Sequence, residues 1–390
     1  MRTMEETGRS GSFSLLGGPL YRLGRRLGLV RGGTNTVPLG LALGALLWTV
    51  LVVLAFAGGV AQQVFSLSVI GAHVRLLVVI PLFFLCESLL DPRVTTFVGT
   101  IVRSGVVPEN ALPALRSEIA RTTRRKDSWL AEAVCLVAAV ALSLSAPHLH
   151  LSGTSAAFDP SRAAAGVTAA GLWYWVVCLT FFRFLMFRWL WRLGLWSYFL
   201  FRMAKLDLHL VPTHPDGVAG LGYLEVVHTY FAPLVVAISA IQAAALAEQF
   251  TSGPVTIEAI YPVLAVVLLV DAVLFLGPLL LFAAKLAACR AKGLSDYMEL
   301  AASYVSGFDR KWLGAAAGSG EPLLGTPDLQ SLADLSNSVG IVRNMRTAPV
   351  SARLLAHLGI AASLPMLPLL LFKYPIAELA EKLLARLAGL

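Results

Sequence analysis

The hydrophobic pattern of the chain consists of long apolar runs separated by shorter polar segments. An α-helix needs about 20 apolar residues to cross the hydrocarbon core of a bilayer. Six runs predict such spans, at 37–61, 70–90, 128–148, 163–182, 226–247 and 259–284. A seventh run at 354–372 contains Pro365 and Pro368, and we expect it either to span or to re-enter. The pattern predicts an all-α, polytopic transmembrane helical bundle of six to seven spans.

The composition agrees with this fold class. Of the 390 residues, 57% are hydrophobic and only 14% are charged, whereas soluble domains carry about 25% charged residues. The mean hydropathy is +0.74. So little charge cannot cover the surface of a soluble protein of this length, and a soluble enzyme is excluded. The four cysteines lie in or beside apolar runs without a CxxC pair, which favours small buried side chains over disulfides.

The basic residues predict the orientation of the bundle. Most of the 31 lysines and arginines fall in 1–36, 91–127, 183–205 and 285–353, and these segments alternate with nearly uncharged loops. Because basic loops stay on the cytoplasmic side, we expect a cytoplasmic N-terminus in a bacterial inner membrane. The net charge of +8 is then a topology signal with attraction to the lipid bilayer, and we expect no nucleic-acid partner.

The alternation divides the chain into nine expected segments. They are a basic tail (1–36), the first two spans (37–90), a cytoplasmic helical segment (91–127), spans three and four (128–192), a cytoplasmic loop (193–225), spans five and six (226–285), a second cytoplasmic helical segment (286–351), the seventh span or re-entrant helix (352–373) and an amphipathic interfacial helix (374–390).

Amphipathic helices are expected in the cytoplasmic segments. Apolar residues recur every three to four positions from Leu294 to Trp312, and Ser295 could cap the start of that helix. Thr326, Pro327 and Asp328 predict the start of the next helix, because they supply a cap, a first-turn proline and an early acid.

Asp271 is the first candidate functional residue, because it is the only charge in the run 259–284. Charged side chains inside a bilayer are costly and often belong to ion or proton pathways. Arg183 is expected within reach of Asp271, and Glu87 and Glu132 near the cytoplasmic ends of their spans complete the candidate pathway. The alternative is a structural ion pair or a protonated carboxyl group bonded to a neighbouring helix.

Arg188 and Arg192 are interpreted differently. Both lie in the expected fourth span, close to its cytoplasmic end. Long arginine side chains there can extend to the headgroups, so we expect both to anchor the helix at the interface.

The segment 209–225, called the histidine loop below, is the second candidate site. It is rich in histidine, glycine and carboxylate side chains, which could bind a metal or, through the glycine backbone, a phosphate-like ligand. The ligand-binding candidates are His209, His214, Asp216, Gly220, Gly222 and Glu225. The spacing matches no specific metal or phosphate motif, so a structural turn stays open as the alternative, and no cofactor is expected.

Several strings resemble an uncharacterised family of bacterial polytopic inner-membrane proteins. They are PTHPDGVAGLGYL (212–224), YVSGFDRKWL (304–313) and EPLLGTPDLQSLADLSNS (321–338), supported by LLGGPLYRL (15–23) and FRWLWRLGLWSYFL (187–200). The family pattern favours glycine where this chain has Ala219. The resemblance implies the polytopic architecture and carries over no catalytic residue.

Three functions fit these observations. The first is a channel or transporter for an ion or small solute that uses Asp271. The second is a non-catalytic assembly or signalling component, in which the cytoplasmic helices dock a cytoplasmic protein partner or a second copy forms a homo-oligomer. The third is a membrane-embedded enzyme with a cytoplasmic site around His214 and Asp216.

Overall fold

The structure is a computed structural model that describes residues 35–145, 168–252, 260–313 and 325–372. Of the N-terminal segment it describes Phe13, Ser14, Gly17, α2 (Pro19–Arg26) and Gly28. The interfacial helix predicted at 374–390 lies outside the described residues.

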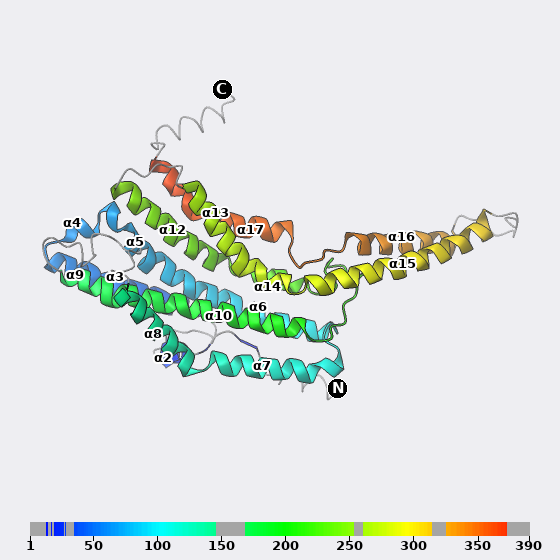
Figure 1. The fold of residues 1–390 in the computed structure, drawn as a ribbon, viewed down its shortest axis with the longest axis horizontal. Helices are drawn as coiled ribbons and strands as arrows, with labels where there is room; N and C mark the ends of the chain where they lie inside the picture. Colours follow the sequence, from blue (N-terminus) through cyan, green and yellow to red (C-terminus); the bar gives the residue numbers. More distant parts are fainter. Residues whose placement is uncertain are drawn as a thin grey trace, which may run out of the picture.

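The described residues form helices and loops, with no β-strand among them (Figure 1). The first half contains α3 (Val37–Ala57), α4 (Ala61–Val64), η1 (Leu67–Val69), α5 (Ile70–His73), η2 (Val74–Val79), α6 (Ile80–Arg103), η3 (Glu109–Ala111), α7 (Leu112–Lys126) and α8 (Trp129–Ser145). The second half contains α9 (Ala169–Leu172), η5 (Trp173–Leu179), α10 (Thr180–Ala204), α11 (Tyr223–Thr229), α12 (Ala232–Ser252), α13 (Ile260–Asp271), η7 (Ala272–Leu276), α14 (Gly277–Leu280), α15 (Ala283–Trp312), α16 (Pro327–Asn344), α17 (Ala352–Ser363) and η8 (Leu364–Phe372).

Six helical stretches are long and apolar enough to cross a membrane, and α7 with α8 adds a seventh if this pair, bent by 46°, counts as one span. The six are Val37–Ala57, Leu67–Arg103, Ala169–Ala204, Tyr223–Thr251, Tyr261–Leu280 and Ala352–Leu369. The chain is therefore an integral membrane protein, and the expected all-α bundle of six to seven spans is confirmed.

Two of the stretches are longer than the sequence predicted. Leu67–Arg103 has 37 residues and Ala169–Ala204 has 36, which corresponds to about 55 Å of helix against a hydrocarbon core of about 30 Å. Both continue because their later turns still bury large side chains, such as Phe97 and Phe199. We call the end of the bundle where these two helices stop, and where α15 leaves, the basic end (Figure 1).

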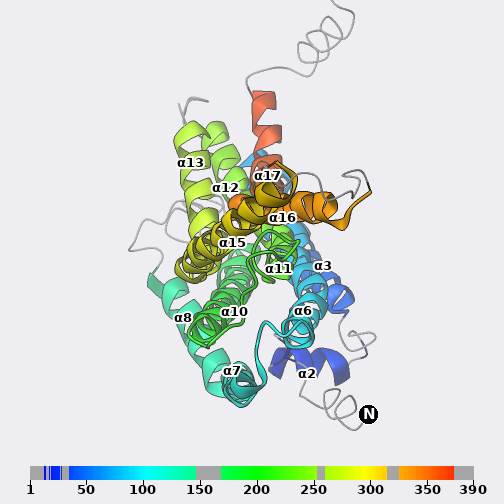
Figure 2. The same ribbon diagram turned by 90° about the vertical axis from the view of Figure 1, so that its right-hand side faces the viewer.

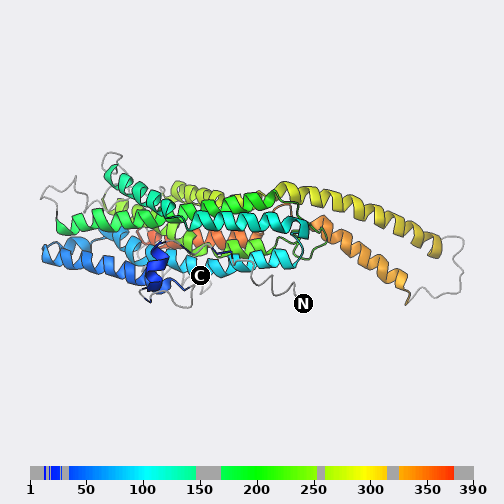
Figure 3. The same cartoon turned by 90° about the horizontal axis from the view of Figure 1, so that it is seen from below.

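The long helices run along the long axis of the molecule (Figures 1 and 3). Seen from the basic end, α6 and α10 lie between α7 on one side and α15 on the other (Figure 2). The helix α12 packs against α6, α13, α17 and η8. Its alanine-rich sequence allows these neighbours to approach closely, as expected for small residues between membrane helices.

π-Helical turns interrupt three of the spans, at η2, η5 and η7. A π-turn widens the helix by one residue and is frequent at functional sites. The first two turns carry Arg75 and Tyr174, and Arg75 Nη1 donates a hydrogen bond to Tyr174 Oη at 2.8 Å. The third turn directly follows Asp271.

The helices α15 and α16 form an antiparallel arm that projects from the basic end (Figures 1 and 3). Ser295 does not cap a helix start, because α15 runs without a break from Ala283 to Trp312. Gly293 is buried inside α15, and a Cβ there would lie 2.6 Å from Pro212 Cβ. The glycine thus allows α15 to cross closely over the histidine loop.

Candidate functional site

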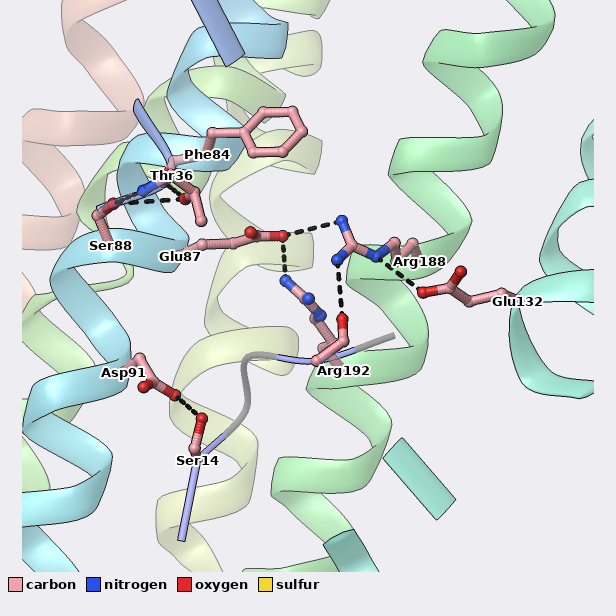
Figure 4. Close-up of polar contacts among 10 residues, drawn as sticks. Ser14, Thr36, Phe84, Glu87, Ser88, Asp91, Glu132, Arg188 and Arg192 are labelled. Carbon is pink, nitrogen blue, oxygen red and sulfur yellow. Dashed lines mark hydrogen bonds and ion pairs between the residues drawn. The ribbon is translucent and has the colours of Figure 1, made fainter. Parts of the chain in front are cut away.

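Glu87 lies at the centre of a buried charge cluster between α6, α8 and α10 (Figure 4). Its Oε1 atom accepts hydrogen bonds from Arg188 Nη1 at 3.1 Å and from Arg192 Nη1. On the far side of Arg188, the Nε atom lies 3.6 Å from Glu132 Oε1. We call Glu87, Glu132, Arg188 and Arg192 the charge cluster; its two carboxylates balance its two guanidinium groups.

The spacing of these residues along their helices explains how they meet. Arg188 and Arg192 are four residues apart, so both side chains lie on one face of α10. Glu87 and Asp91 share the facing side of α6 in the same way. In Figure 4, Glu87 points from α6 toward both arginines, and Glu132 reaches Arg188 from the opposite side.

Three members of the charge cluster are removed from solvent, and the side chain of the fourth, Glu132, is 16% exposed. The side chain of Glu87 is 3% exposed, and those of Arg188 and Arg192 are each 5% exposed. The expectation that both arginines anchor the helix at the membrane interface is wrong, since each is buried and paired with Glu87. Buried ion pairs must offset a large desolvation cost, which mutual neutralisation and hydrogen bonds provide here.

A cavity about the size of one water molecule adjoins Glu87. Glu87, Asp91, Arg192 and the aromatic rings of Trp189 and Phe231 line it. Glu87 Oε2 and Arg192 Nη2 are buried and make no hydrogen bond with the described part of the chain. These two polar atoms could form hydrogen bonds to a single water molecule or a proton-carrying species in the cavity. The cavity is too small for a larger solute in this conformation.

A second cavity of similar size lies on the other side of Arg188. Its lining includes Glu132, Cys135, Arg192, Lys126 and Gly17. Gly17 O accepts a hydrogen bond from Arg188 Nη2 at 3.2 Å, so the N-terminal segment reaches the cluster. This contact could not be predicted from the sequence, because no periodic pattern marks a single docked segment.

Asp271 is buried at the end of α13, only 4% exposed. Neither carboxylate oxygen has a hydrogen-bond partner in the described part of the chain. Arg183 does not pair with it there; Arg183 Nη1 donates to Ser143 Oγ at 2.8 Å. One turn after Asp271, the ring of Phe275 packs 5.4 Å from that of Phe231, which lines the cavity beside Glu87.

The end of the bundle away from the basic end holds further buried polar groups. Arg75 is 4% exposed and Glu248 is 8% exposed. Glu248 Oε1 accepts a hydrogen bond from the backbone N–H of Gly71 at 2.8 Å, and a Cβ on Gly71 would lie between this oxygen and Arg75 Nη1. Buried ionisable groups therefore lie near this end of the bundle as well as in the charge cluster.

Asp216 organises the histidine loop. Its carboxylate accepts backbone hydrogen bonds from Val218 at 2.9 Å, Gly220 at 3.1 Å and Gly222 at 2.7 Å. His214 Nδ1 lies 2.9 Å from the same carboxylate. Because these donors already occupy the Asp216 carboxylate, the contacts describe a structural turn. This is the alternative interpretation of the segment given above.

The segment after α16 docks onto this turn. Arg346 pairs with Glu225, and its backbone N–H donates to Gly217 O at 2.8 Å. The backbone N–H of His209 donates to Val106 O at 2.9 Å. No group of three or more histidine, cysteine, aspartate or glutamate side chains within the described ranges could hold a metal ion. The loop therefore joins the spans to the base of the arm.

His228 lies in the core rather than in a ligand site, with 1% exposure. Its Nε2 atom accepts a hydrogen bond from Trp196 Nε1 at 3.1 Å, so Nδ1 carries the proton and donates to Phe275 O at 2.5 Å. Both ring nitrogens are thus engaged in linking α10, α11 and η7.

Comparisons with known proteins found no match for this chain. No protein-family model, curated protein or solved structure matches the sequence. The resemblance to the inner-membrane family stays a prediction.

Proposed function

We propose that this protein is a channel or transporter that moves protons or a small inorganic ion through its helical bundle. The observation that carries the proposal is the charge cluster around Glu87, which lies beside a water-sized cavity in the interior of an integral membrane protein. Ionisable residues inside spans are expensive to bury and mark ion and proton pathways.

The size of the cavities favours a small species. Both cavities beside the charge cluster accommodate about one water molecule, so an organic solute has no room there. A proton needs only hydrogen-bonded groups and water, and Glu87 Oε2 and Arg192 Nη2 offer such groups.

Asp271 is the second ionisable site of the proposed pathway. Its carboxylate is buried without a partner in the described residues, and the Phe231–Phe275 contact separates it from the cavity at Glu87. Movement of these two rings would connect Asp271 with the charge cluster. The π-helical turn η7 between Asp271 and α14 supplies backbone that can rearrange locally.

Orientation and family membership are part of the proposal. The basic end faces the cytoplasm of a bacterium whose inner membrane holds the protein, and the chain belongs to the family that its sequence strings resemble. Reporter fusions at Ser155 and Gly320 test the orientation. Activity on opposite sides is expected, and activity on the same side contradicts the topology.

The experiment for transport uses purified protein in proteoliposomes, with separate gradients of H⁺, Na⁺, K⁺ and Cl⁻. We expect flux of one of these ions above that of protein-free vesicles. The variant Asp271→Asn should reduce it, while Asp334→Asn on the outside of the arm should not. Absence of flux for all four ions, or equal flux in Asp271→Asn and wild type, contradicts the proposal.

The arm supports a second candidate, a docking function for a protein partner. Met298, Leu300 and Val305 on α15 are between 41% and 54% exposed, although the arm projects beyond the spans. Deleting 297–337 leaves Gly293 and Val342 to hold the base of the arm. Docking predicts that this deletion abolishes the cellular function while flux in proteoliposomes persists; loss of flux instead favours an arm that serves transport.

A further inference from the structure

Three residues of the N-terminal segment insert between the helices that carry the charge cluster. We call Phe13, Ser14 and Gly17 the N-terminal clamp. Phe13 is 1% exposed, and its ring stacks on Phe199 with centroids 4.4 Å apart and on Trp196 at 6.4 Å. A residue from a predicted polar tail is therefore part of the aromatic core at the basic end.

Hydrogen bonds attach the clamp to α6 and α7. On α6, Thr95 Oγ1 donates to Phe13 O at 2.8 Å, and Ser14 Oγ donates to Asp91 Oδ1 at 2.7 Å. On α7, Lys126 Nζ donates to Ser14 O at 3.1 Å. The clamp thus bridges α6 and α7, which both also pack on α10.

The clamp also touches the charge cluster and its two cavities. Gly17 O accepts from Arg188 Nη2, and Gly17 lines the cavity that contains Cys135. Asp91, which binds Ser14, lines the cavity beside Glu87. In Figure 4, Ser14 points toward Asp91, on the basic-end side of Glu87.

We infer that the N-terminal clamp is a built-in plug that closes the charge cluster from the basic end and leaves its place when the pathway opens. The inference rests on the proposed ion pathway through Glu87. Within the described residues, the Phe13 ring and hydrogen bonds that involve side chains hold the clamp, so these contacts can break without unwinding a helix. On release, Asp91, Lys126 and Arg188 lose a protein partner and become accessible to water.

Cys135 offers a direct test, because it lines the cavity under Gly17 and is 8% exposed. In a full-length background with Cys86→Ala, Cys178→Ala and Cys289→Ala, Cys135 is the one remaining thiol. A charged, membrane-impermeant methanethiosulfonate is applied from the basic side in proteoliposomes, and the rate of Cys135 modification is measured.

The variant Phe13→Ala should raise the rate of modification at least about tenfold, because the plug loses its aromatic anchor. A second variant, Ser14→Ala with Thr95→Ala, removes two hydrogen bonds of the clamp and keeps Phe13; it should also raise the rate. The matched control is Phe97→Ala, which removes another ring packed on Trp196, at 6.0 Å, and leaves all three clamp residues in place. Its rate should match that of the background.

Equal rates in the background and in both clamp variants overturn the plug, as does a control that reacts as fast as Phe13→Ala. Flux measurements separate this outcome from failure of the proposed function. If Glu87→Gln abolishes flux but Cys135 modification never changes, only the plug is wrong. If modification rises but Glu87→Gln conducts normally, the clamp covers the cluster but the ion pathway is wrong.

Discussion

The balance of charge inside the bundle depends on Glu87, which pairs with both Arg188 and Arg192. Replacing Glu87 with Gln leaves the two buried guanidinium groups without the carboxylate that they share. Removing one partner of a buried ion pair costs about 3–5 kcal/mol, so Glu87→Gln should lower the unfolding free energy by that amount. Denaturant unfolding in detergent micelles measures the change.

A second substitution separates the ion pair from packing. In the double variant Glu87→Gln with Arg192→Gln, the unpaired charge is removed, and much of the lost stability should return. If the losses of the two single variants simply add in the double variant, the two residues are not coupled and the account of the charge cluster is wrong.

Gly220 is constrained by its backbone conformation and by a close neighbour rather than by charge. Its φ is +98°, and a Cβ would lie 2.6 Å from Val106 Cγ2. Gly220→Ala should therefore destabilise the protein by about 1–3 kcal/mol through backbone strain and overlap. Thermal unfolding checks this against Gly340→Ala, where a Cβ on α16 meets open space and the helix should be unaffected or stabilised.

The environment of a residue was predictable from the sequence where the residue's own chemistry determines it. It was not predictable where a partner distant in the sequence determines it. Asp271 stood out as a charge in an apolar run and is indeed buried. Arg188 and Arg192 lie near the cytoplasmic end of the expected fourth span. At such a position the sequence is the same whether an arginine extends to the headgroups or pairs with a buried carboxylate. Only the position of α6 beside α10 distinguishes the two, and no local pattern encodes that. Ala219 with φ 56° explains why a glycine would suit that position.

Among the elements, the arm has a pH-dependent contact at its tip. Lys311 Nζ lies 2.7 Å from Asp328 Oδ2, and Trp312 Nε1 donates to the same oxygen at 3.1 Å. The hydrogen bond from Lys311, followed by that from Trp312, lowers the pKa of Asp328 below its ordinary value of 3.8. Because the lowered pKa belongs to the folded arm, the contact stabilises α15 against α16 above pH 3.8. It is lost as the pH falls through the lowered pKa.

Hydrogen exchange at the end of α15 measures this loss. Protection of the amides around Trp312, relative to the intrinsic exchange rates, should fall as the pH drops below about 4. The variant Asp328→Asn should be weakly protected at every pH, since its side chain has no charge to lose. Unchanged wild-type protection in acid would show that the contact does not hold the tip.

Element boundaries were predictable where the signal is local. Thr326, Pro327 and Asp328 predicted the start of α16, which begins at Pro327 with Thr326 as its N-cap residue. The start expected at Ser295 was wrong, because a serine after a glycine resembles a cap even inside a helix. Gly293 is present for close packing on Pro212, which is a tertiary contact.

At the scale of the molecule, hydrophobic periodicity was sufficient for the fold class and the number of spans. It could not indicate that α12 packs against so many other helices, or that Phe13 leaves the N-terminal tail and enters the core. Both are long-range packing outcomes, and a single phenylalanine in a basic tail has no period to detect. For the same reason the sequence pointed to Glu87 and Glu132 as pathway candidates but not to their arginine partners, and the expected Asp271–Arg183 contact is replaced by Arg183–Ser143.

The most direct test of the central claim compares ion flux in two matched variants. Glu118, like Glu87, is a buried carboxylate paired with two arginines, Arg121 at 3.3 Å and Arg202 at 2.7 Å, but it lies on α7 near the basic end. In proteoliposomes, Glu87→Gln should reduce flux by at least about tenfold. Glu118→Gln should conduct like the wild type. Equal flux in the two variants would contradict an ion pathway through Glu87.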